Sequence, residues 1–236
     1  MTPRPASGWL QLTLRRIVTL WPLKAMGTTA FMFLFFWGYF GVQQNPLGTP
    51  FTMPLTRLDQ AIAFTPWAYG VYVSLWVYVS LPPALLGQVR PLLQYGLWAT
   101  LMCLFCLGIF WLFPTVTPPF QIDWLAYPEL GLIKQVDTGG NACPSLHVAS
   151  AVFSACWFMR LWRELQAPAA VRWLSVAHCV AIVWSTIAIR QHVVWDAVAG
   201  VAVGLVFAAL SLRHMRHGAR PQSLRTVSTS DLNSRR

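Results

Sequence analysis

Six apolar runs alternate with polar links along most of the chain. The runs cover roughly residues 25–42, 66–81, 92–113, 145–161, 171–189 and 193–212. Each approaches the ~20 apolar residues that an α-helix needs to cross the hydrocarbon core of a bilayer. The pattern therefore predicts an all-α polytopic membrane protein, a bundle of six transmembrane helices that forms one domain over residues 25–213.

Two polar segments flank this predicted domain. Residues 1–24 combine basic side chains with Trp9, Leu10 and Ile17, a composition that favours a short amphipathic helix lying on the membrane surface. Residues 214–236 form a basic tail, which we expect to be disordered and to contact anionic lipid headgroups.

The composition excludes an ordinary soluble domain. Hydrophobic residues make up 56% of the chain and charged residues only 10%, whereas about 25% of the residues in soluble domains are charged. The formal net charge of +10 is compatible with a nucleic-acid partner, but the basic residues lie beside the apolar runs. At those positions they orient helices and contact headgroups, so we expect a lipid substrate and no nucleic-acid partner.

The basic residues also predict the orientation. Fourteen of the seventeen Lys and Arg fall in the two flanking segments and in the links after the second and fourth runs. This side is predicted to be cytoplasmic, because links rich in Lys and Arg stay inside. The links after the third and fifth runs then face the periplasm or exterior of an inner membrane.

Two histidines lie beside these outer links. His147 stands near the start of the fourth run, after Pro144 and Ser145, and His192 stands just before the sixth run. Asp196 follows His192 by four residues, one helical turn, so its carboxylate can orient the ring and stabilise its protonated form. Ser145 is a favourable N-cap, and the N–H groups of the helix start behind it can hold phosphate oxygens. The sequence thus predicts a site at the outer face, with His192 as nucleophile or base and His147 as acid.

These motifs resemble those of a known family. Pro-Ser-Leu-His at 144–147 and the His-x3-Asp at 192–196 are similar to the second and third signatures of the type 2 phosphatidic acid phosphatase superfamily. Leu146, the Ser185-Thr186 pair and Gln191-His192 are more similar to its inositolphosphotransferase-like branch. The resemblance covers roughly residues 90–205.

The resemblance implies a covalent mechanism without metal or cofactor. His192 would attack phosphorus to form a phosphohistidine, Asp196 would orient its ring, and His147 would protonate the departing oxygen. Backbone groups at Ser145 and Leu146 would hold the phosphate. Water would complete a lipid phosphatase reaction, and an alcohol would complete the alternative, a head-group phosphotransferase reaction.

The chain departs from the family pattern at two cationic positions. The first signature, Lys-x6-Arg-Pro, would end at Arg90-Pro91 and require lysine at position 83, where this chain has Pro83. The third-signature arginine, six residues before its histidine, is replaced by Thr186. Because phosphoryl transfer relies on electrostatic stabilisation, we expect the outer cations Arg190 and Lys134 to bind the substrate phosphate instead. The loss disfavours simple monoester hydrolysis and keeps head-group transfer open.

Two further readings belong to other functional classes. Cys143, His147, His192 and Asp196 have acceptable ligand types for a metal, which a chelator would reveal. A non-enzymatic transporter could use the histidine–aspartate pair as a proton relay, and such a protein would form no phosphoenzyme.

Overall fold

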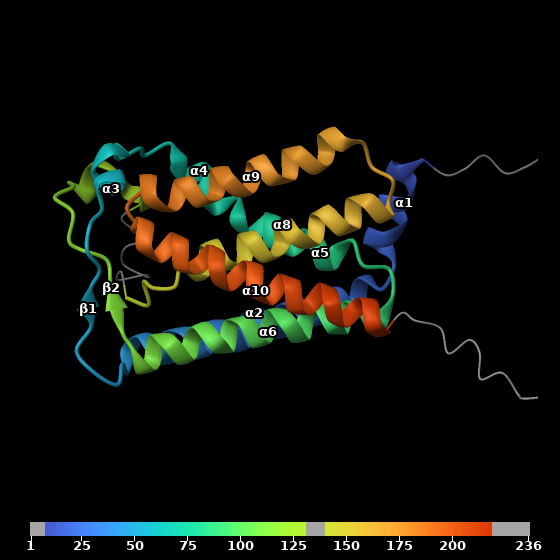
Figure 1. The fold of residues 1–236 in the computed structure, drawn as a ribbon, viewed down its shortest axis with the longest axis horizontal. Coiled ribbons are helices and arrows are strands. Elements are labelled where there is room, and N and C mark those ends of the chain that lie inside the picture. The colour runs from blue at the N-terminus through green and yellow to red at the C-terminus, as the bar shows by residue number, and fades with distance from the viewer. Residues whose placement is uncertain (1–7, 131–139, 219–236) are drawn as a thin grey trace, which may run out of the picture.

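A computed structural model describes residues 8–130 and 140–218, which form a helical bundle (Figure 1). Lys134 and residues 219–236 of the tail lie outside the described residues. The predicted all-α class is confirmed, because the described part consists mainly of helices and its one sheet has only two short strands. The bundle consists of α2 (Trp21–Gln44), α4 (Ala68–Val73) with α5 (Leu75–Ala84), α6 (Val89–Leu112), α8 (Leu146–Glu164), α9 (Ala169–Ala188) and α10 (Val194–Gly218).

Four of these helices are long and apolar enough to cross a membrane. They are α2, α6, α9 and residues Val194–Met215 of α10. The chain is therefore an integral membrane protein. The second predicted run is divided at Ser74 into two short helices, and Pro82 and Pro83, which follow the predicted run, lie inside α5. Six spans thus stay a prediction, with α4–α5 and α8 as the two additional crossings.

The helix α8 lies at the centre of the bundle, where it packs against α5, α6, α9 and α10. Its buried side chains include Trp157, Phe158 and Leu161, and its last turns carry Arg160 and Arg163. A helix surrounded by protein does not need the apolar surface that lipid demands. By contrast, α2 buries only Lys24 among its residues.

Two glycines allow α10 to approach α8 closely. A Cβ atom at Gly200 would lie 2.5 Å from the carbonyl oxygen of Ser145, and one at Gly204 would lie 2.6 Å from that of Ala149. Small residues spaced by four permit such backbone contact between membrane helices. The Ser145 N–H also donates to the carbonyl of Asp196 at 2.9 Å. As a result, the first turns of α8 and α10 lie side by side.

The short elements lie at the two ends of the bundle. The parallel strands β1 (Phe51–Thr52) and β2 (Thr115–Val116), the helix α3 (Arg57–Ala61) and the 3-10 helix η1 (Trp124–Ala126) accompany the starts of α8 and α10 (Figure 1). The opposite end carries α1 (Trp9–Val18), which lies in the N-terminal segment.

Candidate active site

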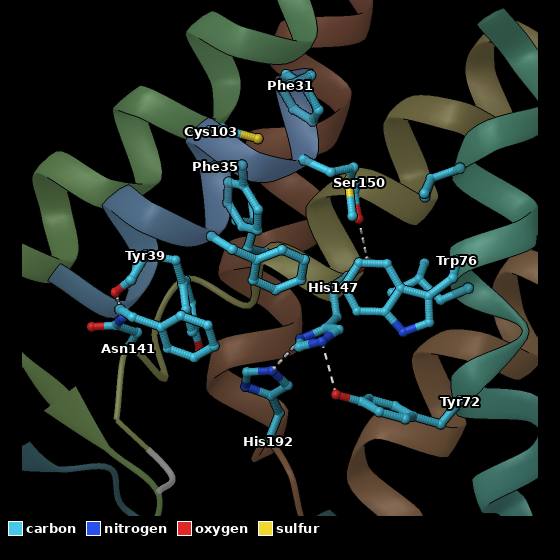
Figure 2. A pocket seen from close by; sticks show the side chains of 16 residues that line it. Phe31, Phe35, Tyr39, Tyr72, Trp76, Cys103, Asn141, His147, Ser150 and His192 are labelled. Carbon is cyan, nitrogen blue, oxygen red and sulfur yellow. Dashed lines mark hydrogen bonds between the residues drawn. The ribbon is translucent and has the colours of Figure 1, made fainter. Parts of the chain in front are cut away.

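The two predicted histidines meet between the first turns of α8 and α10. His147 is the second residue of α8, and His192 lies two residues before α10 begins. The Nδ1 atom of His147 is 3.2 Å from Nε2 of His192, within hydrogen-bonding distance (Figure 2). Their separation of 45 positions in sequence is closed by the contact between the two helices.

Asp196 supports His192 from the first turn of α10. Its Oδ2 atom lies 3.5 Å from Nδ1 of His192 and accepts a hydrogen bond of 3.0 Å from the backbone N–H of Val193. The Asp196 side chain is fully buried, and its Oδ1 has no partner among the described residues. Asp196 thus lies within ion-pair distance of Nδ1 of His192, but this nitrogen has no hydrogen-bond partner among the described residues, and its pairing with Asp196 stays a prediction.

Tyr72 is a site residue that sequence reasoning missed. Its hydroxyl lies 2.8 Å from Nε2 of His147, so it reaches the histidine from α4 (Figure 2). A carboxylate only accepts hydrogen bonds, so Asp196 favours a proton on Nδ1 of His192. Nε2 of His192 then accepts from Nδ1–H of His147, and the Tyr72 hydroxyl donates to Nε2 of His147. This set of tautomers leaves the lone pair of His192 Nε2 directed at His147.

The start of α8 has the predicted cap. The Ser145 hydroxyl accepts from the backbone N–H of Val148 at 3.3 Å, and the peptide bond between Cys143 and Pro144 is cis. Ser145 is completely buried, whereas Leu146 lines the cavity described below. The N–H groups in the first turn of an α-helix have no acceptor within the helix. Those of Leu146 and His147 therefore suit an anionic oxygen.

Arg190 lies in the turn that carries His192, but its guanidinium points to α3 and the segment after it. It donates to the carbonyl oxygens of Asp59 at 2.8 Å and Ile62 at 2.7 Å. Arg190 has φ = 61° and does not line the cavity beside the histidines. Among the cavity-lining residues in the described part of the chain, none is Lys or Arg.

Asp59 is the second residue that was missed. Its Oδ1 accepts from the backbone N–H of Val194 at 2.8 Å, at the first residue of α10. Its Oδ2 accepts from the backbone N–H of Thr56, and the Thr56 hydroxyl accepts from the Asp59 N–H in return. The Thr-x-x-Asp spacing is a recognisable helix-start signal. It predicts a cap for α3, but not the contact with α10.

An apolar cavity of about 380 Å³ opens beside the histidine pair. His147 and His192 lie at one end of it, and aromatic rings surround the rest (Figure 2). These rings come from α2, α4 and α5, and they are Phe31, Phe35, Phe36, Tyr39, Phe40, Tyr72 and Trp76. The cavity suits a hydrocarbon chain, because such chains are received by apolar and aromatic walls with few polar groups.

Cys143 lies beside this site without joining the histidines as a ligand cluster. Within the described residues, no group of three or more His, Cys, Asp and Glu side chains could hold a metal ion. Burial, and secondarily the negative charge of Asp196, raise the pKa of the Cys143 thiol to about 11. A thiol that stays protonated at neutral pH is a poor nucleophile and a poor ligand, so the nucleophile is to be sought among the histidines.

The site is thus a histidine pair held between two closely packed helices of an integral membrane protein. The sequence model of the PAP2 superfamily matches residues 92–218. The chain belongs to this superfamily, whose members are typically phosphatases and phosphotransferases. No curated protein and no solved structure matches the chain. The match includes α8, α9 and α10, whereas Tyr72, Asp59 and the aromatic wall of α2 lie before it.

Proposed function

We propose that the protein is a lipid phosphatase that forms a phosphohistidine on His192. The observation that carries this proposal is the ordered contact of Tyr72, His147, His192 and Asp196 at the end of an apolar cavity. The phosphate would lie at the histidines and the hydrocarbon part of the lipid among the aromatic rings. A transporter would not require a nucleophile and an acid beside the same cavity.

The first chemical step follows from the tautomers. Nε2 of His192 attacks phosphorus, the phosphorus–nitrogen bond forms, and the bond from phosphorus to the leaving oxygen breaks. The substrate phosphate must separate the two rings, because they are in direct contact at 3.2 Å in its absence. In the substrate complex His147 takes the imidazolium form, in which Nε2–H donates to the Tyr72 oxygen, and its Nδ1–H gives a proton to the leaving oxygen, which returns the ring to its neutral form. Asp196 stabilises the positive charge that develops on the ring of His192.

The second step releases the phosphate. The oxygen of a water molecule attacks phosphorus, the phosphorus–nitrogen bond breaks, and His147 accepts the proton of the water. With a phosphodiester lipid as substrate, the phosphorus bound to His192 keeps its head-group alcohol, and a second alcohol in place of water takes up this phosphoryl-alcohol group. This is the head-group transfer of the inositolphosphotransferase-like branch. Two features support it as the second candidate: Thr186 replaces the third-signature arginine, and the described lining of the cavity holds no guanidinium.

The phosphate would be bound mainly by the start of α8. The N–H groups of Leu146 and His147, with the positive end of the helix dipole, supply donors without a charged side chain. Ser145 supports them by capping the helix from within the core. Arg190 and Lys134 stay the cations predicted from the sequence, although the Arg190 guanidinium donates to the carbonyls of Asp59 and Ile62 instead. We place this site at the periplasmic or exterior face, because of the distribution of Lys and Arg.

The decisive experiment traps the covalent intermediate. Purified protein is mixed with a phosphorylated lipid or a nitrophenyl phosphate and quenched in alkali, where phosphohistidine survives. His192→Ala should abolish both turnover and the trapped phosphohistidine. His147→Ala should still form it from nitrophenyl phosphate, because a nitrophenolate leaves without a proton, and should lose lipid turnover by roughly 10²- to 10⁴-fold.

His178→Ala serves as the control variant. His178→Ala removes a histidine of α9 that contacts Ser74 rather than the pair, so it should leave the phosphohistidine yield unchanged. Phosphohistidine in the His192→Ala protein would reject the assigned nucleophile. Loss of activity with EDTA that zinc restores would replace the covalent mechanism by a metal-dependent one.

A further inference from the structure

A second cavity lies at the end of the bundle opposite the histidines. It has a volume of about 510 Å³ and is bounded by α1, the link between α5 and α6, the first turns of α6, α8 and the last turns of α10. Figure 1 shows these elements together at the end that carries α1. The orientation proposed above makes this end cytoplasmic, so the cavity is separated from the proposed reaction by the length of the bundle.

The lining of this cavity is strongly basic. Its charged residues are Arg15, Arg16, Arg90, Arg160 and Glu164. Four guanidinium groups and one carboxylate give a net charge of +3 over these lining residues. Glu164 accepts from Nε of Arg160 at 2.7 Å and lies 3.5 Å from Nη1 of Arg16. It therefore offsets part of the charge and holds two of the arginines in place.

The arginine-bearing wall is fixed to the bundle. The buried Lys24 ammonium donates to the carbonyl oxygens of Arg16 at 2.6 Å and Ala84 at 2.7 Å. This joins the end of α1 to the end of α5. A Cβ atom at Gly87 would lie only 3.4 Å from Cγ of Arg16, so the stem of that arginine packs on the link between α5 and α6. The basic groups are thus held around a common space rather than spread over a surface.

The floor of the cavity adds apolar surface and one unused donor. Leu86, Leu161 and Met215 line it with buried side chains. Trp157 lines it as well, and its indole N–H is buried without an acceptor in the part of the chain that the structure describes. A site that combines guanidinium groups with an apolar floor suits an amphiphilic anion better than a small inorganic ion.

The helix α1 places this cavity at the membrane surface. Leu10, Leu14 and Val18 of α1 are 59%, 64% and 66% exposed, whereas Arg15 and Arg16 of the same helix line the cavity. Such a helix lies in the interface with its apolar side chains among the lipids. Basic pockets between helices at the cytoplasmic surface hold lipid headgroups. We propose that this cavity binds the phosphate of an anionic lipid headgroup, independently of the reaction at the histidines.

Native mass spectrometry of the full-length protein tests this proposal. The protein is incubated in mild detergent with equal amounts of phosphatidylglycerol and phosphatidylcholine, and the bound lipids are counted. The wild type should retain phosphatidylglycerol in preference. Arg16→Gln and Arg90→Gln should each lower that preference about fivefold, since a basic residue near a lipid surface contributes ~1 kcal/mol. Glu164→Gln should raise it, which damage to the fold would not do.

Arg163→Gln is the matched control. Arg163 lies on α8 near the same end, is exposed, and does not line the cavity, so the preference should stay within about twofold of the wild type. His192→Ala should also bind normally, which separates this site from the proposed reaction. A parallel titration with inorganic phosphate shows whether a free phosphate competes for the arginines or the glycerol headgroup is required. Equal retention of both lipids by the wild type, or an equal loss in Arg163→Gln, overturns the proposal.

Discussion

At the scale of single residues, four side chains of the site stand in a row, and each lies within 3.5 Å of the next. Tyr72 contacts His147, His147 contacts His192, and Asp196 stands behind His192. These contacts are compatible with one set of tautomers, because an imidazole nitrogen that accepts a hydrogen bond cannot carry a proton. The order of the groups is what the proposed roles of His147 as acid and His192 as nucleophile rest on.

Tyr72→Phe tests the first contact in this row. Loss of one hydrogen bond to His147 should lower kcat about tenfold for a lipid phosphate. The loss should be smaller for nitrophenyl phosphate, whose leaving group needs no proton from His147. Tyr69→Phe, a tyrosine of α4 that does not line the cavity, should be silent. Equal losses for both substrates would mean that Tyr72 does not act through the acid.

Arg190 gives a test that separates two roles. Its contacts with the carbonyls of Asp59 and Ile62 favour a role in positioning the turn before α10. Arg190→Ala should then lower kcat about tenfold with KM unchanged, as expected for a misplaced nucleophile. A rise in KM for a charged substrate would instead support the phosphate-binding role predicted from the sequence. Arg57→Ala changes an exposed arginine of α3 at the same end and serves as the control.

At the scale of elements, the contact between α8 and α10 is what assembles the site. The sequence predicted the starts of both helices well, because Ser145 and the short link after the fifth run are local signals. The Gly-x3-Gly spacing at 200 and 204 was the available signal for their close packing. Tyr72 and Asp59 could not be predicted, since contacts across 75 and 135 positions leave no local pattern.

Gly200→Ala tests the importance of this contact. A methyl group placed 2.5 Å from the Ser145 carbonyl must push the helices apart. We expect a loss of about 1–3 kcal/mol in stability, and a larger fractional loss of activity because the two rings separate. Thermal unfolding in detergent and the turnover rate measure the two effects. Gly108→Ala is the control, because nothing lies within 4 Å of its added Cβ; equal behaviour of both variants would contradict the assignment.

At the scale of the whole molecule, six apolar runs correspond to six helical regions, yet only four meet the length and hydropathy of a membrane span in the described residues. The difference has a physical cause. The central α8 packs against other helices where a lipid-facing helix would meet lipid, and no Gly or Pro lies within three residues of Ser74, where the second run is divided. Composition predicts which surfaces meet lipid, but not which helix lies inside the bundle.

The orientation can be tested by cysteine labelling from outside in a background without native cysteines. Leu125→Cys, at a position of η1 that is 91% exposed, should react with an impermeant maleimide in intact cells. Gln166→Cys, in the link between α8 and α9 at the other end, should react only after the membrane is opened. Labelling in the reverse order would place the histidine site in the cytoplasm.

The aromatic cavity beside the histidines has a consequence for how the reaction rate is measured. A substrate whose tail occupies that cavity partitions into the bilayer and reaches the protein by lateral diffusion. Its effective concentration is then its mole fraction in the membrane rather than its amount per volume of solution. Adding an inert detergent at constant total substrate should slow such an enzyme by surface dilution. Kinetic constants expressed in mole fraction of substrate would stay the same.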